Sequence, residues 1–195
     1  LPMMSPPELG SVLWTPTPQR IESAGITKFA RWLEVRTQKK FPTYNELWEW
    51  SVSELGPFWE AIWDYFEIDS TSPYDAPLTR SEMPGARWFP GANLNFAQHV
   101  FRKATPERSA IIFGSEGAAT SEISWSQLTT MTATVRAHLQ ASGVGVGDRV
   151  ANYMPNTPET IAAFLATASL GAIWSSCSPD FGATSVIDRF GQIEP

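Results

Sequence analysis

Cysteine and histidine are scarce in this chain of 195 residues, which contains one Cys and two His. One cysteine excludes an internal disulfide framework, and so few potential ligands argue against a zinc site. The scarcity also bears on Cys177, in the stretch SLGAIWSSCSPDFG at 169–182. A catalytic thiolate needs a base within reach, but His99 and His138 both fall in predicted helices that the sequence does not bring to Cys177. We therefore interpret Cys177 as a small residue at the end of a buried strand.

Long apolar runs and basic stripes are also missing. No stretch approaches the roughly 20 apolar residues needed to cross a bilayer, and no signal-peptide pattern stands at the start. The formal net charge is -6, without a cluster rich in Lys and Arg. These features argue against membrane insertion and against nucleic acid as a partner, and they favour a cytoplasmic protein. The proline-rich residues 1–10 predict a loose arm.

What the chain has instead is apolar and aromatic: 43% of its residues are hydrophobic and nine are Trp. That content is enough to bury a core in one or two domains. The first third predicts helices, because apolar residues in 28–36 recur at spacings of three and four. Thr43 followed by Glu46 is a capping-box pattern for the next helix.

An aromatic stripe follows in the stretch 58–68. Four apolar side chains are spaced there as one face of a helix: Trp59, Ile62, Trp63 and Phe66. We interpret the stripe as core rather than as an aromatic cage for a ligand. Residues 69–87 are rich in Ser, Thr, Pro and Asp, which predicts a connector without regular elements. We therefore expect residues 1–87 to be an N-terminal helical part with its linker, and residues 88–195 to begin an α/β domain.

The pattern after Pro106 is typical of an α/β protein. Two short strands at 109–114 and 122–125 predict a hairpin, and Ser126 is expected to cap the helix that follows. A glycine-rich stretch, GVGVGD at 143–148, ends that helix and precedes a strand. A phosphate loop has the opposite order, so we interpret this stretch as a connector.

A strand, helix and strand between 148 and 177 predict a βαβ unit with parallel strands. We expect both faces of the strand at 172–177 to be covered, as is usual for parallel sheets. A helix is predicted at 184–193, capped by Thr184 or Ser185. Because such a helix normally delivers another strand to the sheet, the pattern predicts that the chain is the first part of a larger fold.

Two loops form the candidate ligand site. Ligands of open parallel sheets bind outside the carboxyl ends of the strands, where loops and helix N-termini converge. The stretches 152–156 and 178–182 leave two neighbouring strands at that edge. Paired carboxylates for general acid–base catalysis are not evident, because the acidic residues are scattered along the chain.

Two stretches, in their expected order, resemble the first and second core motifs of adenylate-forming acyl-CoA synthetases: ISWSQL at 123–128 and TASLGAIWSSCSPD at 167–180. The phrase GAIWSSCSPDFG resembles the acetoacetyl branch of that superfamily rather than the acetyl branch. The resemblance covers nearly the whole chain from Leu13, since LWTP, FPTYNELWEWSV and FWEAIWDYFEI resemble the extra N-terminal helical segment of these enzymes.

The resemblance implies an α/β fold in which a helical segment precedes the beginning of the large N-terminal domain, with a partly parallel sheet flanked by helices. It implies a full-length ligase that uses Mg²⁺ to convert acetoacetate and ATP to an acyl-adenylate and pyrophosphate. CoA then attacks the adenylate, giving acetoacetyl-CoA and AMP. The phosphate loop and the catalytic lysine follow downstream in the family. This chain is therefore expected to be an inactive, truncated fragment with no catalytic residue, no metal ligand and no tightly bound cofactor.

By the same resemblance, Ser178, Pro179, Asp180 and Phe181 correspond to the segment that lines the CoA nucleotide site in acetyl-CoA synthetases. That segment reads Phe-Gly-Gly there and Ser-Pro-Asp here. The carboxylate of Asp180 would repel the phosphates of CoA unless an arginine offsets it.

Three alternatives stay open on the sequence alone. The chain could come from a related short-chain synthetase of acetyl or propionyl type. It could also be a non-catalytic α/β module that binds a partner through the Trp-rich helices around Trp59 and Trp63. The third alternative is a hydrolase that depends on Cys177 or a neighbouring serine.

Overall fold

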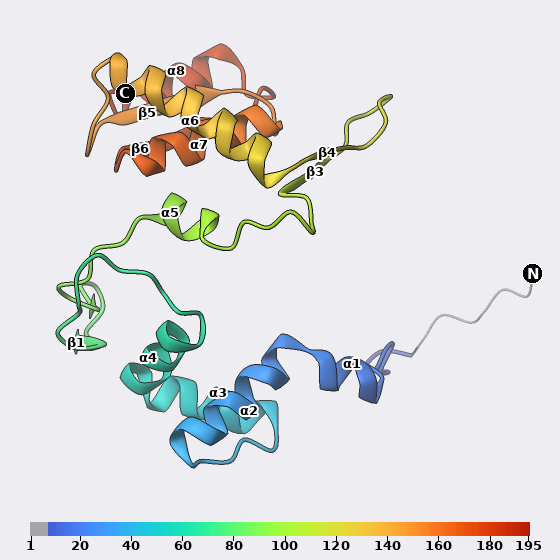
Figure 1. Cartoon of the computed structure of the whole chain (residues 1–195). Coiled ribbons are helices and arrows are strands. Elements are labelled where there is room, and N and C mark those ends of the chain that lie inside the picture. The colour runs from blue at the N-terminus through green and yellow to red at the C-terminus, as the bar shows by residue number, and fades with distance from the viewer. Residues whose placement is uncertain (1–7) are drawn as a thin grey trace, which may run out of the picture. The chain divides into compact units, whose positions relative to one another are not determined.

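The computed structural model describes residues 8–195, and residues 1–7, with most of the predicted N-terminal arm, lie outside the described residues. The described chain forms two compact units (Figure 1). One comprises the chain up to Ile68 together with Tyr74–Ala92, and the other comprises Asp69–Pro73 together with Asn93–Pro195. We call the first the helical unit and the second the α/β unit. The predicted fold class, a helical segment followed by α/β structure, is confirmed.

The helical unit is built from short helices around an aromatic core. Its helices in the described residues are α1 (Pro18–Ser23), α2 (Gly25–Thr37), α3 (Tyr44–Ser53) and α4 (Leu55–Tyr65). The buried core consists of Phe29, Leu33, Phe41, Leu47, Trp50 and Ala61. The ring of Phe29 meets the rings of Phe58 and Tyr65 edge to face, at 6.2 and 5.1 Å between centroids. Such aromatic pairs add about 0.5–1.5 kcal/mol beyond the burial of their surface.

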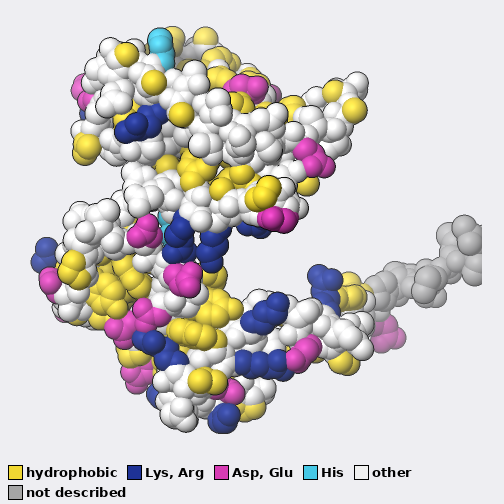
Figure 2. Space-filling model, in the orientation of Figure 1, with side chains coloured by type: hydrophobic (Ala, Val, Ile, Leu, Met, Phe, Trp, Pro, Cys, Tyr) yellow, Lys and Arg dark blue, Asp and Glu magenta, His cyan; other side chains and the backbone are white. Residues whose placement is uncertain are grey.

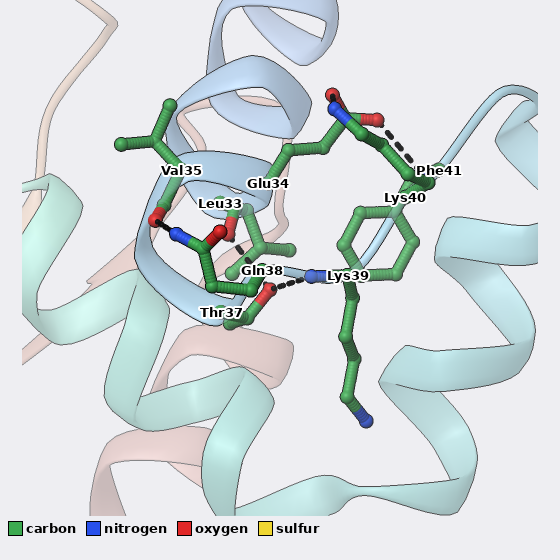
Figure 3. Close-up of polar contacts among 8 residues, drawn as sticks. All are labelled: Leu33, Glu34, Val35, Thr37, Gln38, Lys39, Lys40 and Phe41. Carbon is green, nitrogen blue, oxygen red and sulfur yellow. Dashed lines mark hydrogen bonds and ion pairs between the residues drawn. The ribbon is translucent and has the colours of Figure 1, made fainter.

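The carboxyl end of α2 is closed by local hydrogen bonds (Figure 3). Gln38 has a φ of 59°, so the chain turns there through the left-handed region. The Glu34 carboxylate then accepts a hydrogen bond from the backbone N–H of Phe41 at 2.8 Å and contacts the Lys40 ammonium at 3.4 Å. The hydrogen bond from Phe41, followed by the contact with Lys40, lowers the pKa of Glu34. These contacts direct Phe41 back into the core.

The capping box predicted at the start of α3 is confirmed. The Thr43 hydroxyl accepts from the backbone N–H of Glu46 at 3.3 Å, and the Glu46 carboxylate accepts from the N–H of Thr43 at 2.9 Å. Two N–H groups that lack intrahelical partners are thereby satisfied at once.

The aromatic stripe of α4 is only partly core. Ile62 packs against the buried cluster, but Trp59 is 42% exposed and Phe66 is 48% exposed. Figure 2 shows hydrophobic side chains gathered on the visible face over α4 and the neighbouring strands. The interpretation of the whole stripe as core is therefore wrong for Trp59 and Phe66, since helical spacing identifies a face but not the extent of its cover.

Residues 69–87 were expected to lack regular elements, and this expectation is wrong. A short antiparallel ribbon of β1 (Leu78–Arg80) and β2 (Arg87–Trp88) forms at the end of this stretch. The ring of Trp63 in α4 stacks on Phe89 at 4.6 Å and meets Tyr74 edge to face at 5.1 Å. These ring contacts place the ribbon against α4, a tertiary cause that the composition of the stretch does not reveal.

The α/β unit contains a hairpin, a parallel pair and four helices in the described chain. Its elements are α5 (Phe96–Phe101), β3 (Ile111–Phe113), β4 (Ser121–Ile123), α6 (Trp125–Ala141), β5 (Arg149–Tyr153), α7 (Pro158–Ser169), β6 (Ile173–Cys177) and α8 (Ala183–Gly191). The predicted hairpin is the antiparallel pair β3–β4. The predicted βαβ unit is β5–α7–β6, whose strands run parallel in register from Arg149 opposite Ile173 to Tyr153 opposite Cys177.

Helix α7 organises the core of this unit, because it packs on α5, α6 and β6. The fully packed side chains between these elements are Ala97, Leu128, Ala162 and Leu165. The side-chain amide of Asn95, the N-cap of α5, donates to the backbone carbonyl of Ala168 at 3.0 Å and ties α5 to the end of α7. The expectation that both faces of the parallel pair are covered is wrong, because Ile173 is 54% exposed. Cys177, on the same face of β6, is only 3% exposed, so the cover is lacking at the start of the strand and not along its whole length.

Helix α6 begins two residues earlier than the sequence predicts. Ser124, and not Ser126, is its N-cap: the Ser124 hydroxyl accepts from the N–H of Gln127 at 3.1 Å, and Gln127 accepts from the N–H of Ser124 at 2.8 Å. Both serines precede an apolar helical pattern, so their order along the chain does not decide between them. The glutamine three residues after Ser124 completes a capping box and does decide.

Replacing each serine with alanine therefore shows which of the two caps α6. Ser124→Ala is expected to lower the free energy of unfolding by about 0.5–2 kcal/mol, because an N–H at the start of α6 loses its acceptor. Ser126→Ala, in the first turn and exposed, is the matched control and should change it by less than about 0.5 kcal/mol. Urea titration followed by circular dichroism measures both, and an equal loss in the two variants would contradict the assignment of the cap.

The glycine-rich stretch 143–148 is a connector, as predicted, since it joins α6 to β5. Gly143 has a φ of +90° just after the helix, a conformation in which other residues are strained. Gly171, with a φ of +72°, occupies the corresponding place after α7, and a Cβ there would lie 3.1 Å from the Val146 side chain. The N–H of Gly147 donates to the Gly171 carbonyl at 3.0 Å, so the two helix-to-strand connections lie against each other.

Within residues 8–195, no helix is long and apolar enough to cross a membrane. The same residues contain no group of three or more His, Cys, Asp or Glu side chains placed to hold a metal ion.

Candidate functional site

A cavity of about 580 Å³ lies at the carboxyl ends of β5 and β6. It is lined by Met154, Pro155, Asn156, Thr160, Ser176, Cys177, Ser178, Pro179 and Asp180. Because β5 and β6 are parallel and end in register, both chains leave the sheet at one edge, and the loop after each strand contributes to the cavity wall. The structure therefore brings together the two loops that the sequence placed at the candidate site.

Three of the four predicted site residues line this cavity, and the fourth does not. Ser178, Pro179 and Asp180 are lining residues, whereas Phe181 lies beside the following helix, where the Arg189 guanidinium stacks over its ring at 4.6 Å. We call residues 178–182 the rim loop. The rim loop is exposed throughout, so its conformation depends on hydrogen bonds rather than on burial.

Hydrogen bonds inside the rim loop form a tight turn. The Ser178 hydroxyl donates to the Asp180 carboxylate at 3.0 Å, and the N–H of Phe181 donates to the Ser178 carbonyl at 3.1 Å. Helix α8 then begins after Gly182, which has no side chain to cap it. The prediction that Thr184 or Ser185 caps α8 is therefore wrong, since the chain enters the helix before either residue.

The opposite wall is formed by the turn that leads into α7. The Thr160 hydroxyl donates to the Pro155 carbonyl at 2.7 Å, and the N–H of Thr157 donates to the same carbonyl at 2.8 Å. Next to this turn, the Thr157 hydroxyl and the backbone N–H of Glu159, at the start of α7, lower the pKa of the Glu159 carboxyl. Two prolines and these hydrogen bonds make this wall rigid.

Asn152 is buried beside the cavity with an unmet hydrogen-bond acceptor. It is 8% exposed, and its side-chain oxygen has no partner in the described structure. Asn152 pairs across β5–β6 with Ser176, a lining residue, and residues paired across parallel strands share one face of the sheet. A buried acceptor without a donor costs about 1–3 kcal/mol, so this side of the sheet favours a ligand or water that offers a hydrogen-bond donor.

Among the lining residues, Asp180 is the only one with a charged side chain. The cavity is therefore polar and weakly acidic, and it offers no cation to a phosphate. Arg189 lies at the edge of the rim loop but is engaged with the ring of Phe181.

The structure gives Cys177 no catalytic partner. Its side chain is 3% exposed at the end of β6, as the sequence predicted, and it is a free thiol. His99 lies in α5 and His138 in α6, and neither lines the cavity. The described residues thus bring no histidine base to Cys177 or to the serines beside it, and the one side-chain acceptor at Ser178 is the exposed Asp180 carboxylate.

Thr160 and Arg189 were not predicted at the site, and Tyr153, although it lies in the candidate stretch 152–156, was given no individual role. Tyr153 is the last residue of β5, and its hydroxyl lies within hydrogen-bond distance of two rim-loop carbonyls. Its place at the carboxyl end of a strand was the available signal. The sequence pattern gave no such indication for Arg189. Its guanidinium reaches Phe181 because α8 folds back the eight residues that separate the two along the chain.

Two protein-family models match the chain, one in each unit for most of its length. The family model described as "AMP-binding enzyme" matches residues 97–195, and the model described as "Acetyl-coenzyme A synthetase N-terminus" matches residues 44–100. The first match covers half of the chain and includes the cavity. The chain belongs to the AMP-binding enzyme family.

Within that family, the chain is similar to acetoacetyl-CoA synthetases. It is 45% identical over 183 residues to the acetoacetyl-coenzyme A synthetase of Rhizobium meliloti and 35% identical over 189 residues to that of Xenopus tropicalis, in each case over 94% of this chain. The solved structure of acetoacetyl-CoA synthetase from Streptomyces lividans superposes with a TM-score of 0.89 at 43% identity, over 93% of this chain. The chain spans 28% of the length of these two curated relatives and 29% of the solved chain.

Proposed function

We propose that these residues form the N-terminal part of a ligase that joins acetoacetate to CoA. The observation that supports this most is the superposition on the Streptomyces lividans enzyme, with a TM-score of 0.89 at 43% sequence identity. The proposed reaction consumes ATP, with Mg²⁺, to form an acyl-adenylate and pyrophosphate, and transfer to CoA gives acetoacetyl-CoA and AMP. In this proposal, residues 1–87 are the helical segment with its linker and residues 88–195 are the first part of the AMP-binding domain.

The cavity fits part of this proposal. Its volume of about 580 Å³ lies within the range of small-molecule sites, roughly 300–1,000 Å³. Ser178, Pro179 and Asp180 supply hydroxyl, carbonyl and carboxylate oxygens, and Asn152 supplies an unmet acceptor nearby. Such a lining suits an uncharged, N–H-bearing part of CoA rather than its phosphates, because Asp180 repels anions. We therefore propose Ser178, Pro179, Asp180 and Phe181 as the rim of the CoA site.

The described residues do not supply the chemistry of the reaction. Mg²⁺ binds through one or two carboxylates together with substrate phosphates and water, and this cavity has one carboxylate, Asp180, but no cationic side chain to hold such phosphates. The proposal accordingly assigns the metal, the phosphates of ATP and the catalytic groups to parts of the enzyme outside these 195 residues. The chain alone is expected to form no acyl-adenylate.

A chimera tests the proposed function. The matching 29% of the Streptomyces lividans enzyme is replaced by this chain, and pyrophosphate release and acyl-CoA formation are measured with acetoacetate, acetate and propionate. The chimera is expected to release pyrophosphate with acetoacetate and to form acetoacetyl-CoA, whereas this chain alone is expected to do neither. A folded chimera without activity would contradict the proposal, and a preference for acetate or propionate would favour a different short-chain synthetase.

A further inference from the structure

Tyr153 connects the sheet to the rim loop. It ends β5 opposite Cys177 of β6, and its hydroxyl lies 2.7 Å from the Phe181 carbonyl oxygen and 3.0 Å from that of Pro179. A phenol has one proton, so the two carbonyls share a single donor. The bond reaches 26 and 28 residues along the chain, from one strand of the parallel pair to the loop that follows the other.

The other contacts of the rim loop are local. The Ser178–Asp180 hydrogen bond lies inside the loop, and the Arg189–Phe181 contact joins the loop to α8, which follows it directly. Contacts of this kind set the internal shape of the turn but leave its angle to the sheet undetermined. The Tyr153 hydroxyl is the group that bonds the loop to the neighbouring strand, and Pro179, one of its two acceptors, lines the cavity.

We propose that Tyr153 is a positioning residue whose hydroxyl holds the rim loop against the end of β5 and so sets the shape of the cavity. The consequence for CoA rests on the proposed function: without the hydroxyl, Ser178, Pro179 and Asp180 keep their chemistry but lose their fixed place. Affinity for CoA then falls, while groups bound elsewhere are unaffected.

Amide hydrogen exchange in this chain tests the positioning role. In Tyr153→Phe, the amides of Asp180, Phe181 and Gly182 are expected to exchange roughly two- to tenfold faster than in the wild type, the change that the loss of one hydrogen bond produces. Amides of β5 and β6 should keep their rates. Tyr44→Phe is the control, because Tyr44 is 67% exposed in the other unit. Unchanged exchange in the rim loop of a folded Tyr153→Phe variant overturns the proposal.

A second measurement covers the case in which Tyr153→Phe fails to fold. Tetrafluorotyrosine at position 153 retains the hydroxyl but ionises at lower pH than tyrosine. The chain is first folded at a pH at which the phenol still donates its proton, and the pH is then raised until the phenol has lost it. Rim-loop amides are expected to exchange faster through that ionisation than in the wild type after correction for pH. Identical corrected rates overturn the proposal.

The effect of Tyr153 on CoA binding is measured in the active chimera. Tyr153→Phe is expected to raise the KM for CoA roughly two- to tenfold with the KM for ATP unchanged. If rim-loop exchange accelerates but neither KM moves, Tyr153 positions the loop and the assignment of the rim to CoA is wrong. If the chimera is inactive with Tyr153 in place, the proposed function fails, and the exchange measurement still decides the role of Tyr153.

Discussion

Leu33→Ala is expected to lower the free energy of unfolding of the helical unit by about 2–5 kcal/mol. Leu33 is completely buried at the centre of α2, among Phe29, Leu47 and Trp50. Truncation removes buried apolar surface and also leaves a cavity, because large aromatic neighbours relax only in part. A loss of this size is a large share of the 5–15 kcal/mol that usually stabilises a domain.

Urea titration followed by tryptophan fluorescence measures this loss. Trp125 and Trp174 belong to the α/β unit and the other seven Trp to the helical unit, so fluorescence mainly reports the helical unit. Val35→Ala is the matched control, because Val35 lies on the same helix but is 76% exposed. It should change the free energy of unfolding by less than about 0.5 kcal/mol. Similar losses in the two variants would show that α2 packs differently from the structure described.

Leu165→Ala is expected to destabilise the α/β unit by a similar amount, about 2–5 kcal/mol. Leu165 is 3% exposed on α7 and packs with Ala97 of α5 and Leu128 of α6. Its neighbours in this cluster include small alanines, which cannot rotate to fill the space that the leucine leaves. Because α7 links β5 to β6, the loss should also weaken the parallel pair that carries the cavity.

Hydrogen exchange of the β5 and β6 amides measures this second effect at the site itself. The Leu165→Ala variant is expected to raise exchange rates along both strands, whereas Ile161→Ala, on the same helix but 42% exposed, should raise them far less. Protection retained in both strands of Leu165→Ala would mean that α7 does not hold the pair together.

The features that the sequence predicted correctly are those with local causes. The Thr43–Glu46 capping box depends on two side chains three residues apart, and the parallel pairing of β5 with β6 follows from the helical crossover of a single βαβ unit. The meeting of the two site loops follows from that pairing. Local sequence was enough in each case because the interacting groups are close along the chain or are joined by one helix.

The features that were missed depend on packing between distant segments. The β1–β2 ribbon lies in a stretch whose composition is that of a connector, but Trp63 packs against Phe89 and Tyr74 on either side of it. The exposure of Trp59 and Ile173 likewise depends on which partners reach them, which periodicity does not encode. At the site, the Tyr153 hydroxyl donates to main-chain carbonyl groups of the rim loop. Because every residue has such a carbonyl, the types of the side chains in the loop do not reveal this contact.

The parallel pair of β5 and β6 has a practical consequence for handling the chain. In the described structure each of the two strands pairs only with the other, so each presents one edge of unpaired N–H and C=O groups. Such edges are templates for pairing between molecules, and β-sheet proteins usually protect them. Concentrated samples of the chain should therefore be prone to self-association through these edges, and a lysine or proline at an outward-facing edge position is a rational choice for improving sample behaviour.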